Sequence, residues 1–207
     1  MRVEGRRPSA HLAGASTALK IPPRMTVDEF LTWEPPDHWH GLWQLRDGEP
    51  EMIGASLRRS WLDPVTLVTA YRCASRCMWW PLPACHRSWR SPAERSEDNC
   101  LVPDLGITCS PPTGEHLMHQ PLVLIEILSP TNVSKTRANV HAYRSISTVA
   151  EIVVLHSTAV LAEVLRRAPD GAWLAVPEAV AADGQLRLSS IGFAAPLLDA
   201  YRTTNLT

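Results

Sequence analysis

Residues 121–128 read Pro-Leu-Val-Leu-Ile-Glu-Ile-Leu, a run that is apolar on both faces of an extended chain apart from Glu126. Such a run predicts a central strand that is covered on both sides. On that strand Glu126 shares its face with Leu124 and Leu128, where an ionised carboxylate is costly unless a partner compensates it. The pattern therefore predicts a buried acidic site at Glu126.

Asp104 is the acidic residue best placed to share that site. Residues 101–108 alternate between two faces and predict a neighbouring strand, with Pro103 near its start. Two carboxylates that meet repel each other unless a cation lies between them. Oxygen ligands with open positions suit Mg²⁺, which lowers the pKa of a bound water and neutralises charge on a phosphate during hydrolysis. The residues alone leave a second interpretation open, in which a buried acid is satisfied by backbone donors or a histidine.

The flanking sequence predicts a mixed α/β fold. A capping box formed by Thr26 and Glu29 predicts a short helix that ends near Trp33, and Asp47-Gly48 predicts the turn of a hairpin. Periodicity and turn residues predict the hairpin strands, a helix, two paired strands, two further segments bounded by turns, and a closing short helix. These segments are 42–45, 50–53, 132–146, 150–155, 160–166, 173–176, 185–188 and 196–201.

Length and composition limit the class of protein. The chain has 207 residues, of which 45% are hydrophobic and 20% charged, and a domain of this size can bury a core without disulfides or a structural metal. We assign the domain to residues 25–204 and interpret residues 1–24 as a disordered N-terminal extension, with Met25 as an alternative start. The formal net charge of −1 means that any contact with nucleic acid must be local.

Cysteine usage and hydropathy indicate the compartment. The five cysteines are odd in number and do not follow the pattern of a secreted disulfide framework. The N-terminus lacks the apolar region of a secretory signal, and no apolar run approaches the roughly 18 residues of a membrane span. We therefore expect a soluble, cytoplasmic protein without membrane contact.

Two strings of the chain resemble a known family. Val102-Pro103-Asp104-Leu105 and Leu124-Ile125-Glu126-Ile127-Leu128-Ser129-Pro130-Thr131 closely resemble the restriction endonuclease domain of the Uma type, a branch of the PD-(D/E)XK nuclease superfamily. Residues 25–30, residues 43–49 and the helix containing Tyr143 look like further landmarks. The resemblance implies a mixed sheet flanked by helices, binding of Mg²⁺ or Mn²⁺ by Asp104 and Glu126, and cleavage of DNA phosphodiesters.

Three features of the chain depart from this family. The superfamily has a lysine two residues after the glutamate, where this chain has Leu128. Uma-type relatives often carry a lysine at the position of Asn139, and Lys135 could replace it only if the helix presents it on the same side. Relatives often have a glutamate at the position of Gln44, which can coordinate only through its carbonyl. These changes imply reduced hydrolytic power.

Residues 57–95 do not resemble the family. They are rich in tryptophan, cysteine, proline and arginine, and no helical or strand period persists through them. One interpretation is a basic, aromatic surface for nucleic acid. The interpretation we favour is a compensated pair of frameshifts in the coding DNA.

Two functions remain as hypotheses. The first is a Mg²⁺-dependent DNA endonuclease in which Asp104 and Glu126 hold the ion and Asn139 or Lys135 orients the attacking water, with Gln44 as an altered site position. The second is a catalytically degenerate relative that serves as a binding or oligomerisation module. DNA is the expected partner, and a homodimer is left open as the assembly.

Overall fold

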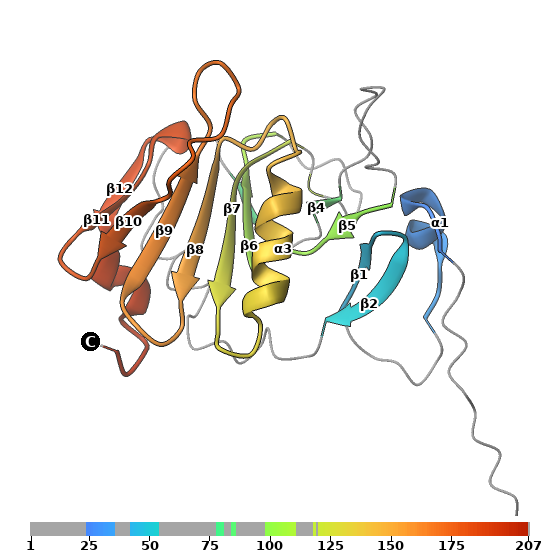
Figure 1. Cartoon of the computed structure of the whole chain (residues 1–207), viewed down its shortest axis with the longest axis horizontal. Coiled ribbons are helices and arrows are strands. Elements are labelled where there is room, and N and C mark those ends of the chain that lie inside the picture. Colours follow the sequence, from blue (N-terminus) through green and yellow to red (C-terminus); the bar gives the residue numbers. More distant parts are fainter. Residues whose placement is uncertain are drawn as a thin grey trace, which may run out of the picture.

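The computed structural model describes residues 24–35, 42–53, 78–80, 84–85, 98–110, 118 and 120–206. Most of the expected N-terminal extension, residues 1–23, and most of residues 57–95 lie outside this part of the chain. In the described part a larger sheet lies between a helix and a C-terminal hairpin, and a smaller sheet lies beside it toward the N-terminus (Figure 1).

The larger sheet has the order β10-β9-β8-β7-β6-β3 within the described residues. Strands β7 and β8 run parallel, whereas the other neighbours pair antiparallel. The predicted strand at residues 121–128 is β7, and its place inside the sheet explains why it is apolar on both faces. The strands are β3 (Met78–Trp80), β6 (Leu105–Thr108), β7 (Pro121–Leu128), β8 (Glu151–His156), β9 (Leu161–Arg166) and β10 (Glu178–Ala181).

Helix α3 (Val133–Tyr143) forms the connection between the parallel strands β7 and β8, which need such a crossover because a tight turn cannot join them. It covers one face of the sheet, where Leu124 and Leu128 pack against Val140 and Tyr143. These contacts put the helix directly over the strand face that carries Glu126.

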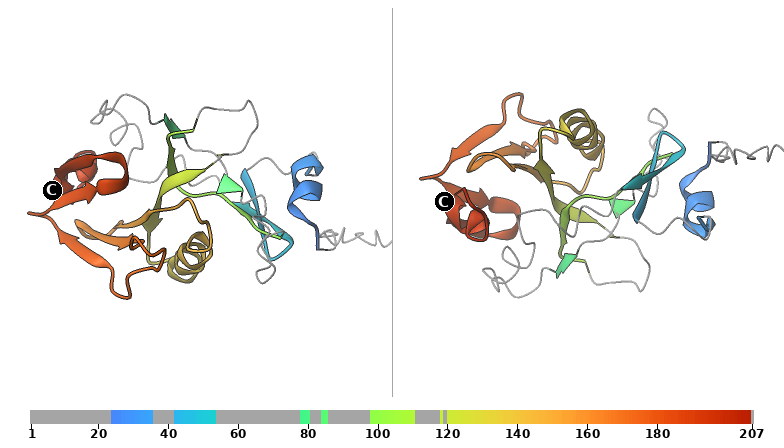
Figure 2. Two further views of the ribbon diagram at one scale, coloured as in Figure 1. Left: turned by 90° about the horizontal axis from the view of Figure 1, so that it is seen from above. Right: turned by 90° about the horizontal axis from the view of Figure 1, so that it is seen from below.

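The opposite face is covered by C-terminal elements, as the two views in Figure 2 show. Leu105, Ile107 and Ile125 lie in the core cluster on this side, together with Leu197 and Tyr201. The single proton of the Tyr201 hydroxyl is shared between the carbonyls of His156 and Leu161, each 2.9 Å from the hydroxyl oxygen. The covering elements are β11 (Gln185–Leu188), the 3-10 helix η2 (Ser189–Ile191), β12 (Phe193–Pro196) and the 3-10 helix η3 (Leu197–Tyr201).

The smaller sheet contains the predicted hairpin, in the order β2-β1-β5-β4 among the described residues. Asp47 and Gly48 have φ values of 48° and 78°, the left-handed pair that a two-residue hairpin turn requires. Helix α1 (Val27–Thr32) begins at the predicted capping box of Thr26 and Glu29. The strands are β1 (Leu42–Arg46), β2 (Glu49–Ile53), β4 (Ala84–Cys85) and β5 (Cys100–Leu101).

The prediction of one strand over residues 101–108 is wrong in one respect, because the strand is broken at residues 102–104. Its first part, β5, belongs to the smaller sheet, and its second part, β6, belongs to the larger sheet. Pro103 has no N–H to donate to a ladder, and the Val102 N–H points to the Gln44 side-chain oxygen at 3.5 Å. The chain therefore changes sheets at residues 102–104.

In the segment predicted at residues 173–176, Trp173 forms an isolated bridge to Arg167, and strand β10 follows at residues 178–181. Cys100 and Cys109 are each disulfide-bonded, although cysteine count and spacing predicted no disulfide framework. In the described part of the chain, no helix has the length and hydropathy of a membrane span.

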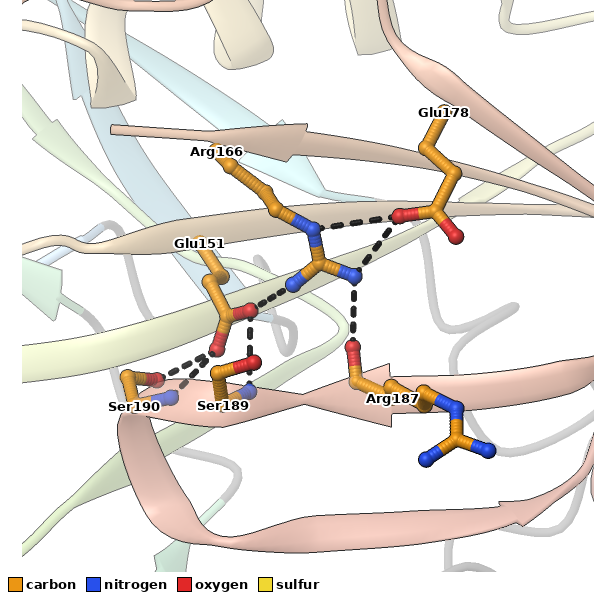
Figure 3. Close-up of polar contacts among 6 residues, drawn as sticks. All are labelled: Glu151, Arg166, Glu178, Arg187, Ser189 and Ser190. Carbon is orange, nitrogen blue, oxygen red and sulfur yellow. Dashed lines mark hydrogen bonds and ion pairs between the residues drawn. The ribbon is translucent and has the colours of Figure 1, made fainter. Parts of the chain in front are cut away.

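A buried carboxylate fastens the C-terminal elements to the sheet (Figure 3). Glu151 on β8 forms an ion pair with Arg166 on β9, which also binds Glu178 on β10 at 2.9 Å. The oxygen that binds Arg166, Oε1, also accepts the Ser189 backbone N–H, and Oε2 accepts the Ser190 backbone N–H, at 3.1 Å each. Glu151 therefore has its hydrogen bonds satisfied within the protein, as a buried charge requires.

Candidate functional site

Asp104 and Glu126 meet where β6 begins beside β7. Asp104 immediately precedes β6, and because Leu105 pairs with Ile125, the continued antiparallel register places Asp104 opposite Glu126. Their carboxyl groups share a hydrogen bond. Glu126 is buried, with 5% of its surface exposed, and Asp104 is half-buried. The structure thus brings together the two acids that the sequence predicted as a pair.

Burial changes the ionisation of this carboxyl pair. It raises the pKa of Glu126 to about 8, and the negative charge of Asp104 adds to the rise. Burial likewise raises the pKa of Asp104 above its ordinary value. Charged forms of two adjacent acids oppose each other, so without a cation the pair is held together by a shared proton.

Each carboxylate has one oxygen fixed by the protein. Glu126 Oε1 accepts hydrogen bonds from Asn139 Nδ2 at 2.9 Å and from the Tyr143 hydroxyl at 2.7 Å. Asp104 Oδ2 accepts the Ile127 backbone N–H at 2.6 Å. Burial raises the pKa of Tyr143 well above its ordinary value, so its hydroxyl keeps its proton and acts as a donor.

The second oxygens of Asp104 and Glu126 suit a divalent cation. Among the described residues, no backbone or side-chain donor contacts either of these oxygens apart from the two carboxyl groups' own contact. Nor does any group of three or more His, Cys, Asp or Glu side chains converge in the described part. Two carboxylate oxygens with the remaining positions left to water and substrate are the ligand set that Mg²⁺ tolerates.

Asn139 lies between Glu126 and Arg46, a residue of the β1–β2 hairpin. Its Nδ2 donates to Glu126, and its Oδ1 accepts a hydrogen bond from Arg46 Nη2 at 2.5 Å. Asn139 is buried. Its hydrogen bond to Glu126 is therefore stronger than it would be in water, because the protein interior has a low dielectric constant. Its amide is thus used on both sides by protein partners.

Gln44 is buried but does not contact the carboxyl pair. Its Oε1 lies 3.5 Å from the Val102 N–H, and its Nε2 donates to Glu51 Oε2 at 2.8 Å. Gln44 and Glu51 are cross-strand partners in the hairpin. The Glu51 carboxylate therefore stands opposite Gln44 in the hairpin.

Lys135 faces the hairpin from α3. Its Nζ lies 3.2 Å from Glu51 Oε2, and the same Glu51 oxygen accepts Arg46 Nε at 3.3 Å. Arg46 in turn binds Asn139. Lys135 and Asn139 therefore both face the hairpin, as residues four apart on one helix face should. Leu128, at the position where the resemblance implies a lysine, is buried in the apolar cluster under α3.

Sequence reasoning missed Arg46 and Glu51. A signal for Glu51 was present, since a two-residue turn at Asp47-Gly48 fixes the register in which Gln44 pairs with Glu51. Arg46 follows from the same alternation, which puts it on the Gln44 face of β1. What the sequence did not contain was the docking of this hairpin against α3.

Comparison with known proteins supports the fold. No family model matches the chain, and a search of curated proteins finds no match. A solved structure from Anabaena variabilis, described as a "putative nuclease belonging to DUF820", is similar with a TM-score of 0.61 and 14% sequence identity, over 86% of this chain and 98% of that one. The predicted fold class, a mixed sheet flanked by helices, is thereby confirmed.

Proposed function

We propose that this chain is a divalent-metal-dependent nuclease that hydrolyses DNA phosphodiesters, with Asp104 and Glu126 as the metal-holding residues. The observation that carries the proposal is the convergence of buried Glu126 and half-buried Asp104, each with one oxygen that no donor among the described residues contacts apart from the facing carboxyl group. A purely structural acid is satisfied by its neighbours, as Glu151 is in the same protein.

The residues around the pair position it for this role. Asn139 and Tyr143 hold Oε1 of Glu126 from the α3 side, while the Ile127 N–H holds Oδ2 of Asp104 from the β7 backbone. Such outer contacts orient metal-binding carboxylates and tune their affinity. When bound, Mg²⁺ or Mn²⁺ would lower the pKa of a coordinated water and neutralise charge on the phosphate.

The fold of the neighbour agrees with this function without establishing it. The Anabaena variabilis protein is described as a "putative nuclease", and at 14% identity its likeness supports a shared fold, whereas function depends on the site. The convergence of Asp104 and Glu126 is what supports a nuclease site in this chain. Resemblance to the Uma-type endonuclease domain rests on the strings around these same two residues.

A second candidate function is a degenerate nuclease fold that binds a partner without cleaving it. Leu128 favours this candidate, because an apolar side chain stands where the superfamily has its catalytic lysine and is buried under α3. In this case the acid pair would retain a proton and bind metal weakly.

Metal binding and cleavage test the proposal together. Mn²⁺ binding is measured by calorimetry and nicking of supercoiled plasmid DNA is measured with Mg²⁺ or Mn²⁺, for the wild-type protein and an Asp104→Asn/Glu126→Gln variant of similar shape. We expect both activities in the wild-type protein and neither in the variant. Equal nicking by the two proteins contradicts the proposal, and weak or absent Mn²⁺ binding together with absence of nicking supports the degenerate candidate.

A matched control excludes a general effect of removing two carboxylates. Glu163 and Glu178 lie on β9 and β10, where they pair with Arg137 and Arg166. A Glu163→Gln/Glu178→Gln variant has the same change in net charge as the site variant. It should retain wild-type Mn²⁺ affinity and nicking.

A further inference from the structure

Three donors converge on one oxygen of Glu51. Gln44 Nε2 lies at 2.8 Å, Lys135 Nζ at 3.2 Å and Arg46 Nε at 3.3 Å from Glu51 Oε2. Two donors come from strand β1 and the third from helix α3, so the hairpin and the helix meet at this point. A guanidinium, an ammonium and an amide N–H around a single oxygen form the kind of environment that binds a phosphate oxygen.

This cluster lies next to the carboxyl pair. Arg46 connects the two, because it binds Glu51 through Nε and Asn139 through Nη2, and Asn139 in turn binds Glu126. The positive charge of Arg46 also acts on Glu126 and lowers its pKa against the larger effect of burial. A phosphate held at this cluster would therefore lie beside the proposed metal position.

Glu51 is the anion that occupies the cluster in the free protein. Partial burial raises its pKa, but the Gln44 hydrogen bond and the charges of Lys135 and Arg46 outweigh this effect, and the pKa lies below its ordinary value. Glu51 therefore stays ionised at neutral pH and neutralises both cations.

The solvent exposure of the cluster allows another anion to replace Glu51. The side chains of Lys135 and Glu51 are 40% and 38% exposed, so a ligand can reach them from solvent. Arg46 is only 19% exposed and keeps its bond to Asn139 whichever anion binds. An exposed ion pair of this kind contributes little to stability, so its exchange for another anion costs little.

We propose that Arg46 and Lys135 form a subsite for a backbone phosphate of the DNA substrate, and that Glu51 is an internal competitor which holds the two cations until the phosphate displaces it. The inference rests on the proposed function for the identity of the substrate. It assigns Lys135 and Arg46 to phosphate binding.

DNA binding without metal tests the subsite. Affinity for a short fluorescein-labelled DNA duplex is measured by fluorescence anisotropy in EDTA, so that neither cleavage nor metal binding contributes. A Glu51→Gln substitution removes the competing charge and should raise DNA affinity about tenfold, since it frees two charge-assisted contacts. Lys135→Gln should lower the affinity and reduce the slope of log affinity against log salt by about 1.

Glu163→Gln and Arg137→Gln are the matched controls. Arg137 lies on the same helix and binds Glu163 through two hydrogen bonds of 2.6 Å, so each control changes net charge by the same amount as its counterpart. The controls should change DNA affinity less than twofold. If Glu163→Gln raises the affinity as much as Glu51→Gln does, or if Lys135→Gln acts no more strongly than Arg137→Gln, the subsite is refuted.

The outcomes separate this inference from the proposed function. If the wild-type protein binds Mn²⁺ and nicks plasmid DNA while the Glu51 and Lys135 variants bind DNA like their controls, the inference fails and the nuclease stands. If Glu51→Gln tightens DNA binding selectively but Mn²⁺ does not bind, the nuclease fails and the phosphate subsite stands. Lys135 is exposed on a helix, so its variant tests the subsite even if Glu51→Gln disturbs the hairpin.

Discussion

Arg46 donates a hydrogen bond to the side-chain oxygen of Asn139 at 2.5 Å, and this contact determines which end of the Asn139 amide faces Glu126. With its oxygen taken by the guanidinium, Asn139 presents its NH₂ group to Glu126 Oε1. The hairpin thereby acts on a carboxylate of the central strand through a residue of the helix. The amide suits this position, because its oxygen accepts on one side and its NH₂ group donates on the other.

Asn139→Asp should therefore destabilise the protein by about 2 kcal/mol. The new carboxylate can still accept from Arg46, but its second oxygen faces Glu126 Oε1 with no proton to donate. Urea unfolding measures the loss, which should grow as the pH rises and both acids ionise. A loss that is equal in acid and alkaline solution would contradict this account of the amide.

The metal-free protein should lose stability as the pH rises through the range between 4.5 and about 8, because the pKa of Glu126 is raised across it. In this range the folded state holds a proton that the unfolded state has released, and stability falls with pH wherever the folded state binds more protons. The contribution is on the order of 5 kcal/mol, present below the unfolded pKa and lost above the folded one.

Thermal unfolding in EDTA at several pH values measures this effect. Glu126→Gln removes the titration while its side chain can still accept from Asn139 and Tyr143. The variant should therefore show a flatter pH dependence and a higher Tm than the wild-type protein above about pH 8. If the two proteins have parallel pH profiles, Glu126 does not hold a proton in the folded state.

Local sequence patterns predicted the elements around the site well, for reasons that are local themselves. The apolar strand at residues 121–128 and the turn at Asp47-Gly48 depend on burial on both faces and on backbone conformation, which short segments specify. The pairing of Asp104 with Glu126 followed from treating an isolated buried acid as a residue in need of a partner.

The rest depended on contacts between distant segments. The alternation of side chains between two faces at residues 101–108 cannot show that the chain leaves one sheet and enters another, because both halves are extended and have the same two-residue period. Strand β10 contains Glu178 and two alanines and has little strand propensity of its own, so its pairing with β9 determines its conformation. Glu51 was missed because its role requires the hairpin to dock on α3.

Glu151→Gln should destabilise the protein by about 3 kcal/mol, as expected when one partner of a buried ion pair is removed. The substitution removes the charge that pairs with Arg166, and it replaces one acceptor oxygen, either Oε1 facing Arg166 and Ser189 or Oε2 facing Ser190, with an NH₂ group. Urea unfolding gives the value.

Glu178→Gln is the control for that prediction, because Glu178 binds the same Arg166 but its side chain is 51% exposed. An exposed ion pair contributes less than about 1 kcal/mol. Equal losses for the two substitutions would mean that burial of the Glu151 carboxylate is not what makes the network stabilising.

Tyr143→Phe should weaken Mn²⁺ binding about tenfold, the effect of losing a residue that orients a metal-binding carboxylate. The Tyr143 hydroxyl lowers the pKa of Glu126 by donating to it, so its loss makes the carboxylate harder to ionise, and metal binding requires the ionised form.

Tyr201→Phe is the matched control, since Tyr201 is equally buried but donates to backbone carbonyls on the opposite face of the sheet. Both substitutions remove a buried hydrogen bond and should each cost about 1 kcal/mol of stability, measured by urea unfolding in EDTA. Only Tyr143→Phe should change the Mn²⁺ affinity measured by calorimetry, because only this hydroxyl touches Glu126. A tenfold loss in both variants would trace the effect to general loosening of the fold, and no loss in either would mean that Glu126 does not bind the metal.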